Sequence, residues 1–306
     1  MTQAITQHET TAADGTRLYY ETSGVEDSSA STILLCDGIG CDGFVWKYLQ
    51  PWLATQYKVV HSHYRGHGQS GFASDEANYT IGHIVDDLMC VLDAADVPTA
   101  TLIGHSMGVQ VSIEAALTAP KRVDGLALLC GSFGRPLDTF HDHSMLKLAL
   151  PVVAKAVDRF NHLLKPVVRT LMPTDLGWQI AKRTEVDPKM LKREDFLPYL
   201  EHLSRMDYRI FVRILAAAAA HTTEDRLHLV EQPALVVGGE KDRFTPYWVS
   251  EVLGDRLPRA TLQMVRGGTH TAPLEHQRLM EMWLGDFLAT SGLSASSGDA
   301  VPAGAL

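Results

Sequence analysis

The sequence predicts a three-layer α/β fold in which a mostly parallel, eight-stranded sheet is flanked by helices. Up to residue 130, short apolar runs typical of buried strands alternate with stretches whose apolar spacing is typical of helices. This alternation stops between Phe133 and Leu227, where the pattern is helical, and strand patterns return near residues 234 and 260. We therefore expect one α/β core that is interrupted by a helical insertion.

The first part of the core is expected over residues 1–132. The Asp14-Gly15 turn signal predicts a hairpin over Thr10–Gly24. The later strands are largely apolar, which is typical of strands buried inside a parallel sheet. The expected strands are Thr32–Cys36, Tyr57–His63, Ala100–Ile103 and Val123–Cys130, and the helices between them are Phe44–Thr55, Thr80–Ala95 and Val109–Leu117.

The helical insertion is expected over residues 133–227, as a cap or lid on the core. Apolar residues at helical spacing, among them Met145, Leu148 and Val152, predict a face that either lines an acyl pocket or packs on the core.

The second part of the core is expected over residues 228–290. Residues 291–306 are rich in Ser, Ala and Gly, which predicts a disordered tail. The remaining predicted elements are the strands Ala234–Gly239 and Ala260–Val265 and a last helix over Pro273–Thr290.

Composition and charge exclude several classes of function. The chain of 306 residues has a net charge of −9 and no cluster of Lys and Arg, which argues against a nucleic-acid partner. Its polar first residues are unlike a signal peptide, and no apolar run reaches the ~18 residues of a membrane span. Because the cysteines lack metal or disulfide spacing, we expect free thiols and a cytoplasmic location. These cysteines are Cys36, Cys41, Cys90 and Cys130.

A short stretch around Ser106 predicts a nucleophile. Ser106 lies between an expected strand and an expected helix, in the run Gly104-His105-Ser106-Met107-Gly108. Such a tight turn crowds the residues two before and two after the serine, and glycine removes the clashing Cβ atoms. The serine hydroxyl would then stand at a helix N-terminus beside exposed backbone N–H groups. The pattern alone also fits an ordinary glycine-flanked turn, so the rest of the chain must decide.

A serine nucleophile needs a base, and the base needs a carboxylate to orient it. Loops at the carboxyl ends of parallel strands converge on one crevice, and two such loops carry suitable residues. Asp242 follows the strand that ends at Gly239, and His270 follows the strand that ends at Val265. The chain order Ser, Asp, His is the order found in α/β hydrolases.

Other readings of these residues remain open at this point. Asp242 could be a helix N-cap, with Glu240 as the rival carboxylate, and His270 could be a loop histidine without a catalytic role. We expect His276 to be a solvated helix residue and Asp86 to be an exposed or capping charge.

Taken together, these motifs resemble the capped, esterase-like branch of the α/β-hydrolase superfamily over about Thr10 to Thr290. The resemblance implies that Ser106 is the nucleophile, that His270 is the base and then the acid, and that Asp242 orients it. It also implies that the backbone N–H groups of Ile39 and Met107 form the oxyanion hole. The matching runs are Asp37-Gly38-Ile39-Gly40, Arg65-Gly66-His67-Gly68-Gln69-Ser70 and Gly104-His105-Ser106-Met107-Gly108.

Two positions depart from the family pattern together. Members usually carry His-Gly at the oxyanion loop and an Asp two residues before the Arg-Gly-x-Gly run, whereas this chain has Asp37 and His63 there. Because the two strands are neighbours in this fold, we expect a reciprocal swap in which Asp37 and His63 form a charge-assisted hydrogen bond.

Two further patterns suggest cofactors but lack required partners. Gly38 to Gly43 fits G-x-G-x-x-G, yet after Asp42 the next acidic residue is Asp75, too far along the chain for a ribose-binding acid. His61, His63 and His67 lie close in sequence without a carboxylate to join them, which argues against a metal site. We therefore expect no cofactor and no metal.

The sequence predicts a serine hydrolase that cleaves a small-molecule carboxylic ester with an apolar or aromatic acyl group. A lactonase, thioesterase, carbon–carbon bond hydrolase or acyltransferase would use the same three residues. A non-catalytic, ligand-binding relative is the alternative from a different class, and such relatives often lack one of the three.

Overall fold

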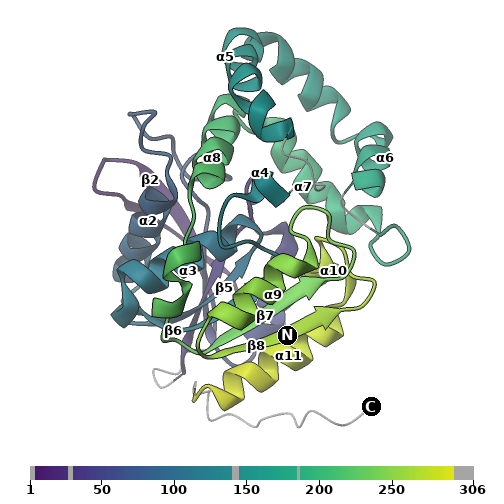
Figure 1. The fold of residues 1–306 in the computed structure, drawn as a ribbon. Coiled ribbons are helices and arrows are strands. Elements are labelled where there is room, and N and C mark those ends of the chain that lie inside the picture. Colours follow the sequence, from purple (N-terminus) through teal and green to yellow (C-terminus); the bar gives the residue numbers. More distant parts are fainter. Residues whose placement is uncertain (1–3, 27–29, 140–144, 185–186, 293–306) are drawn as a thin grey trace.

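The computed structural model describes residues 4–26, 30–139, 145–184 and 187–292, and it confirms the predicted α/β fold, a mostly parallel sheet flanked by helices. Its centre is an eight-stranded sheet with the order β1-β2-β4-β3-β5-β6-β7-β8 (Figure 1). The strands are β1 (Thr6–Thr11), β2 (Arg17–Gly24), β3 (Thr32–Cys36), β4 (Lys58–Ser62), β5 (Ala100–His105), β6 (Val123–Leu129), β7 (Ala234–Gly239) and β8 (Ala260–Val265).

Strand direction divides the sheet into a parallel part and a hairpin. The strands from β4 to β8 in spatial order all pair in parallel, whereas β2 pairs antiparallel with both β1 and β4. In the register, Leu35 lies opposite His61, and Cys36 lies opposite Gly104. The carboxyl ends of β3, β4 and β5 therefore meet at one edge of the sheet.

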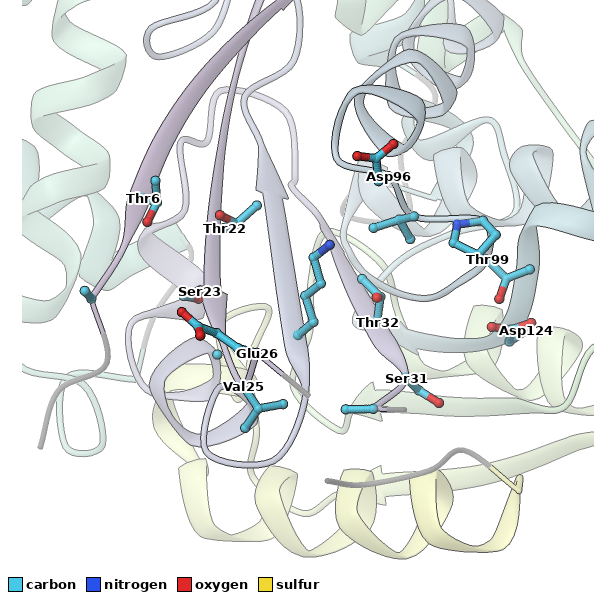
Figure 2. Close-up of a pocket in the computed structure, with 16 residues that line it drawn as sticks. Thr6, Thr22, Ser23, Val25, Glu26, Ser31, Thr32, Asp96, Thr99 and Asp124 are labelled. Carbon is cyan, nitrogen blue, oxygen red and sulfur yellow. The ribbon is translucent and has the colours of Figure 1, made fainter. Parts of the chain in front are cut away.

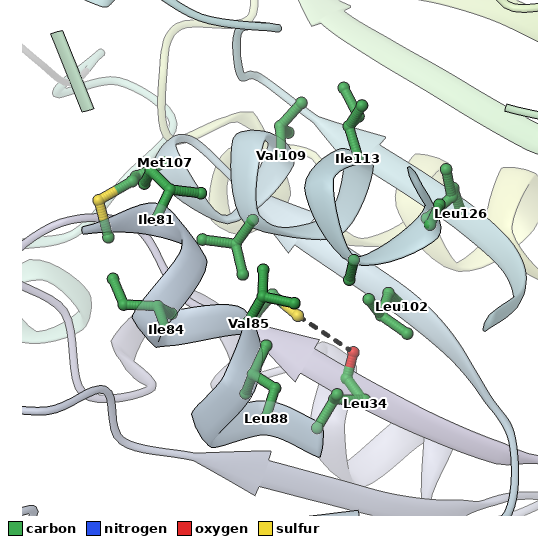
Figure 3. Packing of buried hydrophobic residues seen from close by; sticks show 14 of the residues in the cluster. Leu34, Ile81, Ile84, Val85, Leu88, Leu102, Met107, Val109, Ile113 and Leu126 are labelled. Atoms are coloured by element: carbon green, nitrogen blue, oxygen red, sulfur yellow. Dashed lines mark hydrogen bonds between the residues drawn. The ribbon is translucent and has the colours of Figure 1, made fainter. Parts of the chain in front are cut away.

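Helices cover both faces of the sheet, as fully apolar parallel strands require. One face packs against α2 (Ile81–Ala94), α3 (Met107–Thr118) and α9 (Tyr247–Arg256), and Figure 3 shows part of this core between α2, α3 and the strands. The other face packs against η1 (Phe44–Trp46), α1 (Leu49–Leu53) and α11 (Gln277–Thr290). The short helices η2 (Pro120–Arg122), η4 (Glu224–Leu229) and α10 (Ala272–Glu275) complete the core.

A group of helices lies above the carboxyl edge of the sheet (Figure 1). Asp195 of this group accepts hydrogen bonds from Lys47 (2.5 Å) and Tyr48 (2.8 Å), and these contacts join the group to the core. The extent of 133–227 as a domain stays a prediction, and residues 293–306 of the predicted tail lie outside the described part of the chain. The helices are α4 (Pro136–Thr139), α5 (Met145–Leu171), α6 (Asp175–Thr184), α7 (Arg193–Arg205) and α8 (Tyr208–Ala220).

Two helices predicted as continuous are broken in the structure. The segment expected as one helix over Phe44–Thr55 is split into η1 and the five-residue α1. Pro51 explains this break, because a proline ring clashes with the preceding turn and fits only near the start of a helix. The last predicted helix is interrupted at His276, whose backbone (φ −126°, ψ 48°) is not helical.

A cavity of about 790 Å³ lies at the opposite edge of the sheet from Ser106 (Figure 2). It is lined by the amino ends of parallel strands, including Thr32 and Lys58, together with the loop before β5. Active sites of open parallel sheets lie at the carboxyl ends of their strands, so this cavity is at the wrong edge for the predicted chemistry.

Across the described residues, no helix is both long and apolar enough to cross a membrane.

Candidate active site

The backbone at Ser106 has the strained conformation that the sequence predicts. Ser106 has φ 57° and ψ −117°, between the end of β5 and the start of α3. A Cβ atom at Gly104 would lie 2.4 Å from the carbonyl oxygen of Gly108, and a Cβ at Gly108 would lie 2.0 Å from that of Cys36. Both positions therefore require glycine, because only glycine allows the helix to approach the strands this closely.

Three side chains from three separate loops form a hydrogen-bonded chain. The Ser106 hydroxyl donates to Nε2 of His270 (2.9 Å), and Nδ1 of His270 donates to the Asp242 carboxylate (2.8 Å). The Asp242 side chain is fully buried, and that of His270 is 12% exposed. This geometry puts a base within reach of the serine and fixes its tautomer through the carboxylate.

The Asp242 carboxylate is saturated with hydrogen bonds besides the one from His270. Its oxygens accept from the backbone N–H groups of Phe244 (2.8 Å) and Thr245 (2.9 Å) and from the Thr245 hydroxyl (2.8 Å). Asp242 thus caps the following turn and contacts His270 as well, so the two readings of this residue are compatible. The rival carboxylate of Glu240 points elsewhere and accepts from the backbone of Gly267 (2.7 Å).

Two residues that sequence reasoning missed hold the His270 loop. Glu275 is buried and accepts from the backbone N–H and hydroxyl of Thr269 (2.9 and 2.6 Å) and from the hydroxyl of Thr271 (3.0 Å). His105, next to the serine, donates from Nε2 to the carbonyl oxygen of His270 (2.9 Å). Burial lowers the pKa of His105 to about 4, so it is neutral at pH 7. The signal available in the sequence was the carboxylate of Glu275, five residues after His270, which is close enough to bind the loop that carries this histidine.

The loop after β3, which the family resemblance assigns to the oxyanion hole, lies opposite the serine. A Cβ atom at Gly38 would lie 3.1 Å from Cβ of Ser106. In the described part of the chain, the backbone N–H groups of Ile39 and Met107 have no hydrogen-bond acceptor. The N–H of Gly40, by contrast, donates to Nε2 of His67 (3.0 Å), which fixes this loop.

The predicted pairing of Asp37 with His63 is wrong, because the partner of Asp37 is His61. Asp37 is fully buried and accepts from Nε2 of His61 (2.9 Å) and from Nε1 of Trp46 (2.6 Å). His63 follows the end of β4, and its Nδ1 accepts the backbone N–H of Gln69 (2.9 Å) instead. Its ring occupies the space that a Cβ at Gly68 would need, so it is held by its own loop.

A buried ion pair lies behind the same loop. Arg65 donates from Nε and Nη2 to the two carboxylate oxygens of Asp87 (2.7 and 2.6 Å) and from Nη1 to Asp14 (2.9 Å). Asp86 is exposed, as predicted, whereas its neighbour Asp87 is buried. The sequence held a signal for this pair, because Asp87 falls on the apolar face of α2 between Ile84 and Leu88.

The helices above the sheet reach the loop after β3 through two apolar side chains. A Cβ at Gly40 would lie 2.6 Å from Leu203 of α7 and 3.1 Å from Phe211 of α8. Val152, predicted to line a pocket or pack on the core, is 70% exposed, so that prediction is wrong. The side chains of Met145 and Leu148 lie outside the described part of the structure.

Within the described ranges, no group of three His, Cys, Asp or Glu side chains is arranged to hold a metal ion. His61 and His63 contact each other as rings, with centroids 5.3 Å apart. The run from Gly38 to Gly43 leads into the three-residue η1 rather than an α-helix, so it offers no helix N-terminus for a pyrophosphate.

Comparison with known proteins gives one family and several relatives. Residues 31–277 match the α/β hydrolase fold family. The chain is 28% identical over 275 residues to "Putative carbamate hydrolase RutD" of Variovorax paradoxus (strain S110), covering 89% of this chain and 96% of that protein. It is 26% identical over 302 residues to 2-hydroxy-6-oxononadienedioate/2-hydroxy-6-oxononatrienedioate hydrolase of Cupriavidus pinatubonensis (strain JMP 134 / LMG 1197), covering 94% and 97% of the two chains.

Solved structures share the fold. The enol-lactonase from Burkholderia xenovorans LB400 superimposes with a TM-score of 0.75 at 20% identity, over 92% of this chain and all of that chain. An esterase, RhEst1, from Rhodococcus sp. ECU1013 superimposes with a TM-score of 0.73 at 21% identity, over 95% of this chain and all of that one.

Proposed function

The chain belongs to the α/β hydrolase fold family and is a hydrolase, and from this premise we propose that it cleaves carboxylic esters through an acyl-enzyme on Ser106. The observation that carries the proposal is the hydrogen-bonded chain from Ser106 through His270 to Asp242, with contacts of 2.9 and 2.8 Å. A serine hydroxyl is a poor nucleophile at neutral pH, and this arrangement supplies the base that it lacks.

In the proposed reaction, Nε2 of His270 takes the hydroxyl proton while Oγ of Ser106 attacks the ester carbonyl. Asp242 holds the ring and stabilises the imidazolium that forms. The N–H groups of Ile39 and Met107 donate to the oxyanion, and each such donor is worth on the order of 100- to 1000-fold in rate. The imidazolium protonates the leaving alcohol, and a water activated by His270 then releases the acid.

We infer an apolar or aromatic acyl group from the side chains around the site. Leu203 and Phe211 lie over Gly40 of the oxyanion loop, and the Phe244 ring centroid is 4.9 Å from that of His270. Such walls favour apolar groups through burial of apolar surface. None of the four cysteines forms a disulfide in the described part of the chain, which supports a cytoplasmic location as part of the proposal.

The same acyl-enzyme chemistry would open a lactone, cleave a thioester or a carbon–carbon bond, or pass the acyl group to an alcohol. The relatives include, by name, "Putative carbamate hydrolase RutD" and a 2-hydroxy-6-oxononadienedioate/2-hydroxy-6-oxononatrienedioate hydrolase, and the structural neighbours include an enol-lactonase. We favour ester cleavage because the apolar side chains around the site suit an apolar or aromatic acyl group.

The test is a panel of p-nitrophenyl esters of increasing chain length, together with lactones and thioesters, and labelling by a fluorophosphonate probe. We expect wild type to label and to turn over at least one ester, and Ser106→Ala to do neither while keeping its melting temperature. Product analysis with added alcohol separates hydrolysis from acyl transfer. A wild-type chain that neither labels nor cleaves any substrate would refute the proposal.

The two carboxylates after β7 offer a matched control. Asp242→Asn is expected to lower kcat by about 10⁴-fold, because the amide stabilises the wrong tautomer of the base. Glu240→Gln removes a carboxylate two residues away that contacts only the neighbouring loop, and it is expected to retain activity. Equal losses in both variants would contradict the assignment of Asp242.

A further inference from the structure

The longest helix of the molecule carries an apolar face that is open to solvent. Helix α5 spans Met145–Leu171, and a row of its large apolar side chains is exposed. We call these residues, together with two from α6, the outer apolar face. They are Val152, Val153, Phe160, Leu163, Leu164, Val167 and Leu171 of α5, and Leu176 and Ile180 of α6.

The exposed row is distinct from the side of α5 that packs on the protein. At 3.6 residues per turn, its members fall within an arc of about 120° on the helix. A different side, with Leu150, Ala154 and Val157, contacts α8 through Val212 and Ala219. Phe160 is 45% exposed, Leu163 57% and Val167 53%, so these side chains do not serve the core. Exposed apolar patches of this extent mark interaction surfaces.

The segment that carries this face has a net charge opposite in sign to that of the whole chain. Residues 149–183 carry six Lys or Arg and two Asp, whereas the chain as a whole has a net charge of −9. The two acids are paired with arginines of neighbouring helices, Asp158 with Arg213 (3.7 Å) and Asp175 with Arg193 (3.4 Å). Among the described residues, none of the six basic side chains forms an ion pair. They are Lys155, Arg159, Lys165, Arg169, Lys182 and Arg183.

Two of these cations lie beside aromatic rings. The Arg159 guanidinium is 5.8 Å from the centroid of the Phe160 ring, and Nζ of Lys182 is 5.9 Å from that of Trp178. Apolar rings with cations at their edge suit an interface where hydrocarbon meets charged headgroups, because the long basic stems lie along apolar surface while the charge stays in water.

We propose that α5 and α6 dock the protein on an anionic lipid surface through the outer apolar face. A helix of 27 residues is about 40 Å long, and it lies along one end of the molecule (Figure 1), as an interfacial helix requires. The remainder of the chain carries a net negative charge and is repelled by anionic headgroups, which favours docking through this end. A second copy of the same face would bring two positively charged surfaces together, which disfavours a symmetric dimer.

The docking surface shares residues with a groove, one lining side chain of which lies against the loop opposite Ser106. Val167 and Leu171 of α5 line a groove of about 240 Å³ with Leu176, Ile180 and, at its inner side, Leu203. Leu203 is the side chain that lies over Gly40 of the oxyanion loop. A docked molecule would thus present this apolar groove to the lipid.

The test is co-sedimentation of the full chain with vesicles. We expect wild type to bind vesicles of phosphatidylcholine with phosphatidylglycerol, to bind pure phosphatidylcholine far more weakly, and to be released by salt. The double variant Lys155→Gln with Arg159→Gln is expected to bind the anionic vesicles about 30-fold more weakly, because each cation near such a surface strengthens binding about fivefold. Phe160→Ser with Leu163→Ser is expected to reduce it at least about tenfold.

Leu229→Ser is the matched control, because Leu229 is 57% exposed on η4 of the core, and it should bind like wild type. All variants should keep the wild-type melting temperature and the activity on soluble esters, so loss of docking and loss of hydrolysis are separable. The proposal is overturned if wild type ignores anionic vesicles, if both double variants bind like wild type, or if light scattering shows a dimer that Phe160→Ser with Leu163→Ser disrupts.

Discussion

Replacing His61 by glutamine tests whether the Asp37–His61 contact is a buried ion pair. Asp37 is fully buried and has His61 and Trp46 as hydrogen-bond donors. Burial alone raises the pKa of the Asp37 carboxyl, but the charge and hydrogen bond of His61 outweigh it and hold that pKa below its usual value. Burial likewise opposes the charge on His61, yet Asp37 raises the pKa of His61 above 6.5.

Removing one member of a buried pair costs about 3–5 kcal/mol, because the other charge is left without compensation. Glutamine at position 61 keeps one N–H that reaches toward Asp37, so we expect the free energy of unfolding to fall by about 3 kcal/mol near pH 6. The contribution of His61 is fully present below its unfolded pKa of about 6.5 and is lost as the pH rises through its raised, folded-state pKa. Asp37 stabilises the folded state above about pH 4, where its carboxyl is ionised. The stabilisation by the pair is therefore lost only on the alkaline side, as His61 loses its proton, so the decrease in unfolding free energy caused by His61→Gln should become smaller toward alkaline pH.

The assay is urea unfolding followed by tryptophan fluorescence, near pH 6 and again near pH 9–10. His63→Gln is the control, because burial lowers the pKa of His63 to about 4 and this residue carries no charge in the pair. The change in unfolding free energy caused by His63→Gln should not become smaller toward alkaline pH. A loss for His61→Gln that is below about 1 kcal/mol, or equal at both pH values, would refute an ion pair at this site.

Three further predictions concern the serine turn, the orienting carboxylate and acid stability. Gly108→Ala would place a Cβ 2.0 Å from a backbone oxygen of β3. We therefore expect insoluble protein or a melting temperature lowered by many degrees, and a soluble variant with the wild-type melting temperature would contradict the close packing. Thr245→Val removes the hydroxyl bonded to Asp242, and kcat should fall about tenfold with KM unchanged; full activity in steady-state kinetics would show that this bond is dispensable. Burial lowers the pKa of both His67 and His105 to about 4, so below pH 6.5 the unfolded chain binds more protons than the folded one. The free energy of unfolding should therefore decrease as the pH falls from about 6.5 toward 4. An unfolding free energy that does not change with pH in urea titrations would exclude this linkage.

Sequence reasoning succeeded where the constraint is local. The apolar runs lie within the strands of the sheet, because burial on both faces leaves few alternatives to apolar residues. The two glycines around Ser106 were explained by a crowded turn, and the Cβ distances at those positions show the crowding directly. The order of Ser106, Asp242 and His270 placed all three at the same edge of the sheet, since carboxyl ends of parallel strands converge.

It failed where side chains compete for one partner. The register aligns Leu35 with His61, so Asp37 and His63 do occupy corresponding positions beyond the strands. Which histidine reaches Asp37 depends on the loop after His63, whose Gln69 N–H binds that ring. The helical spacing of apolar residues also shows that a helix has an apolar face, but it does not show what that face contacts. For this reason Val152 was predicted to be covered, whereas it is exposed.

The position of the helical insertion in the chain has a consequence for biosynthesis. β6 ends at Leu129, and its neighbour in the sheet, β7, begins only at Ala234. At typical rates of synthesis this interval takes about 5–20 s, during which the backbone edge of the entirely apolar end of β6 has no strand to pair with. Unpaired apolar edges recruit other chains. A nascent chain stalled within the insertion therefore presents an aggregation-prone edge at Leu126–Leu129, and a fragment released at that point lacks β7 and should recruit chaperones there.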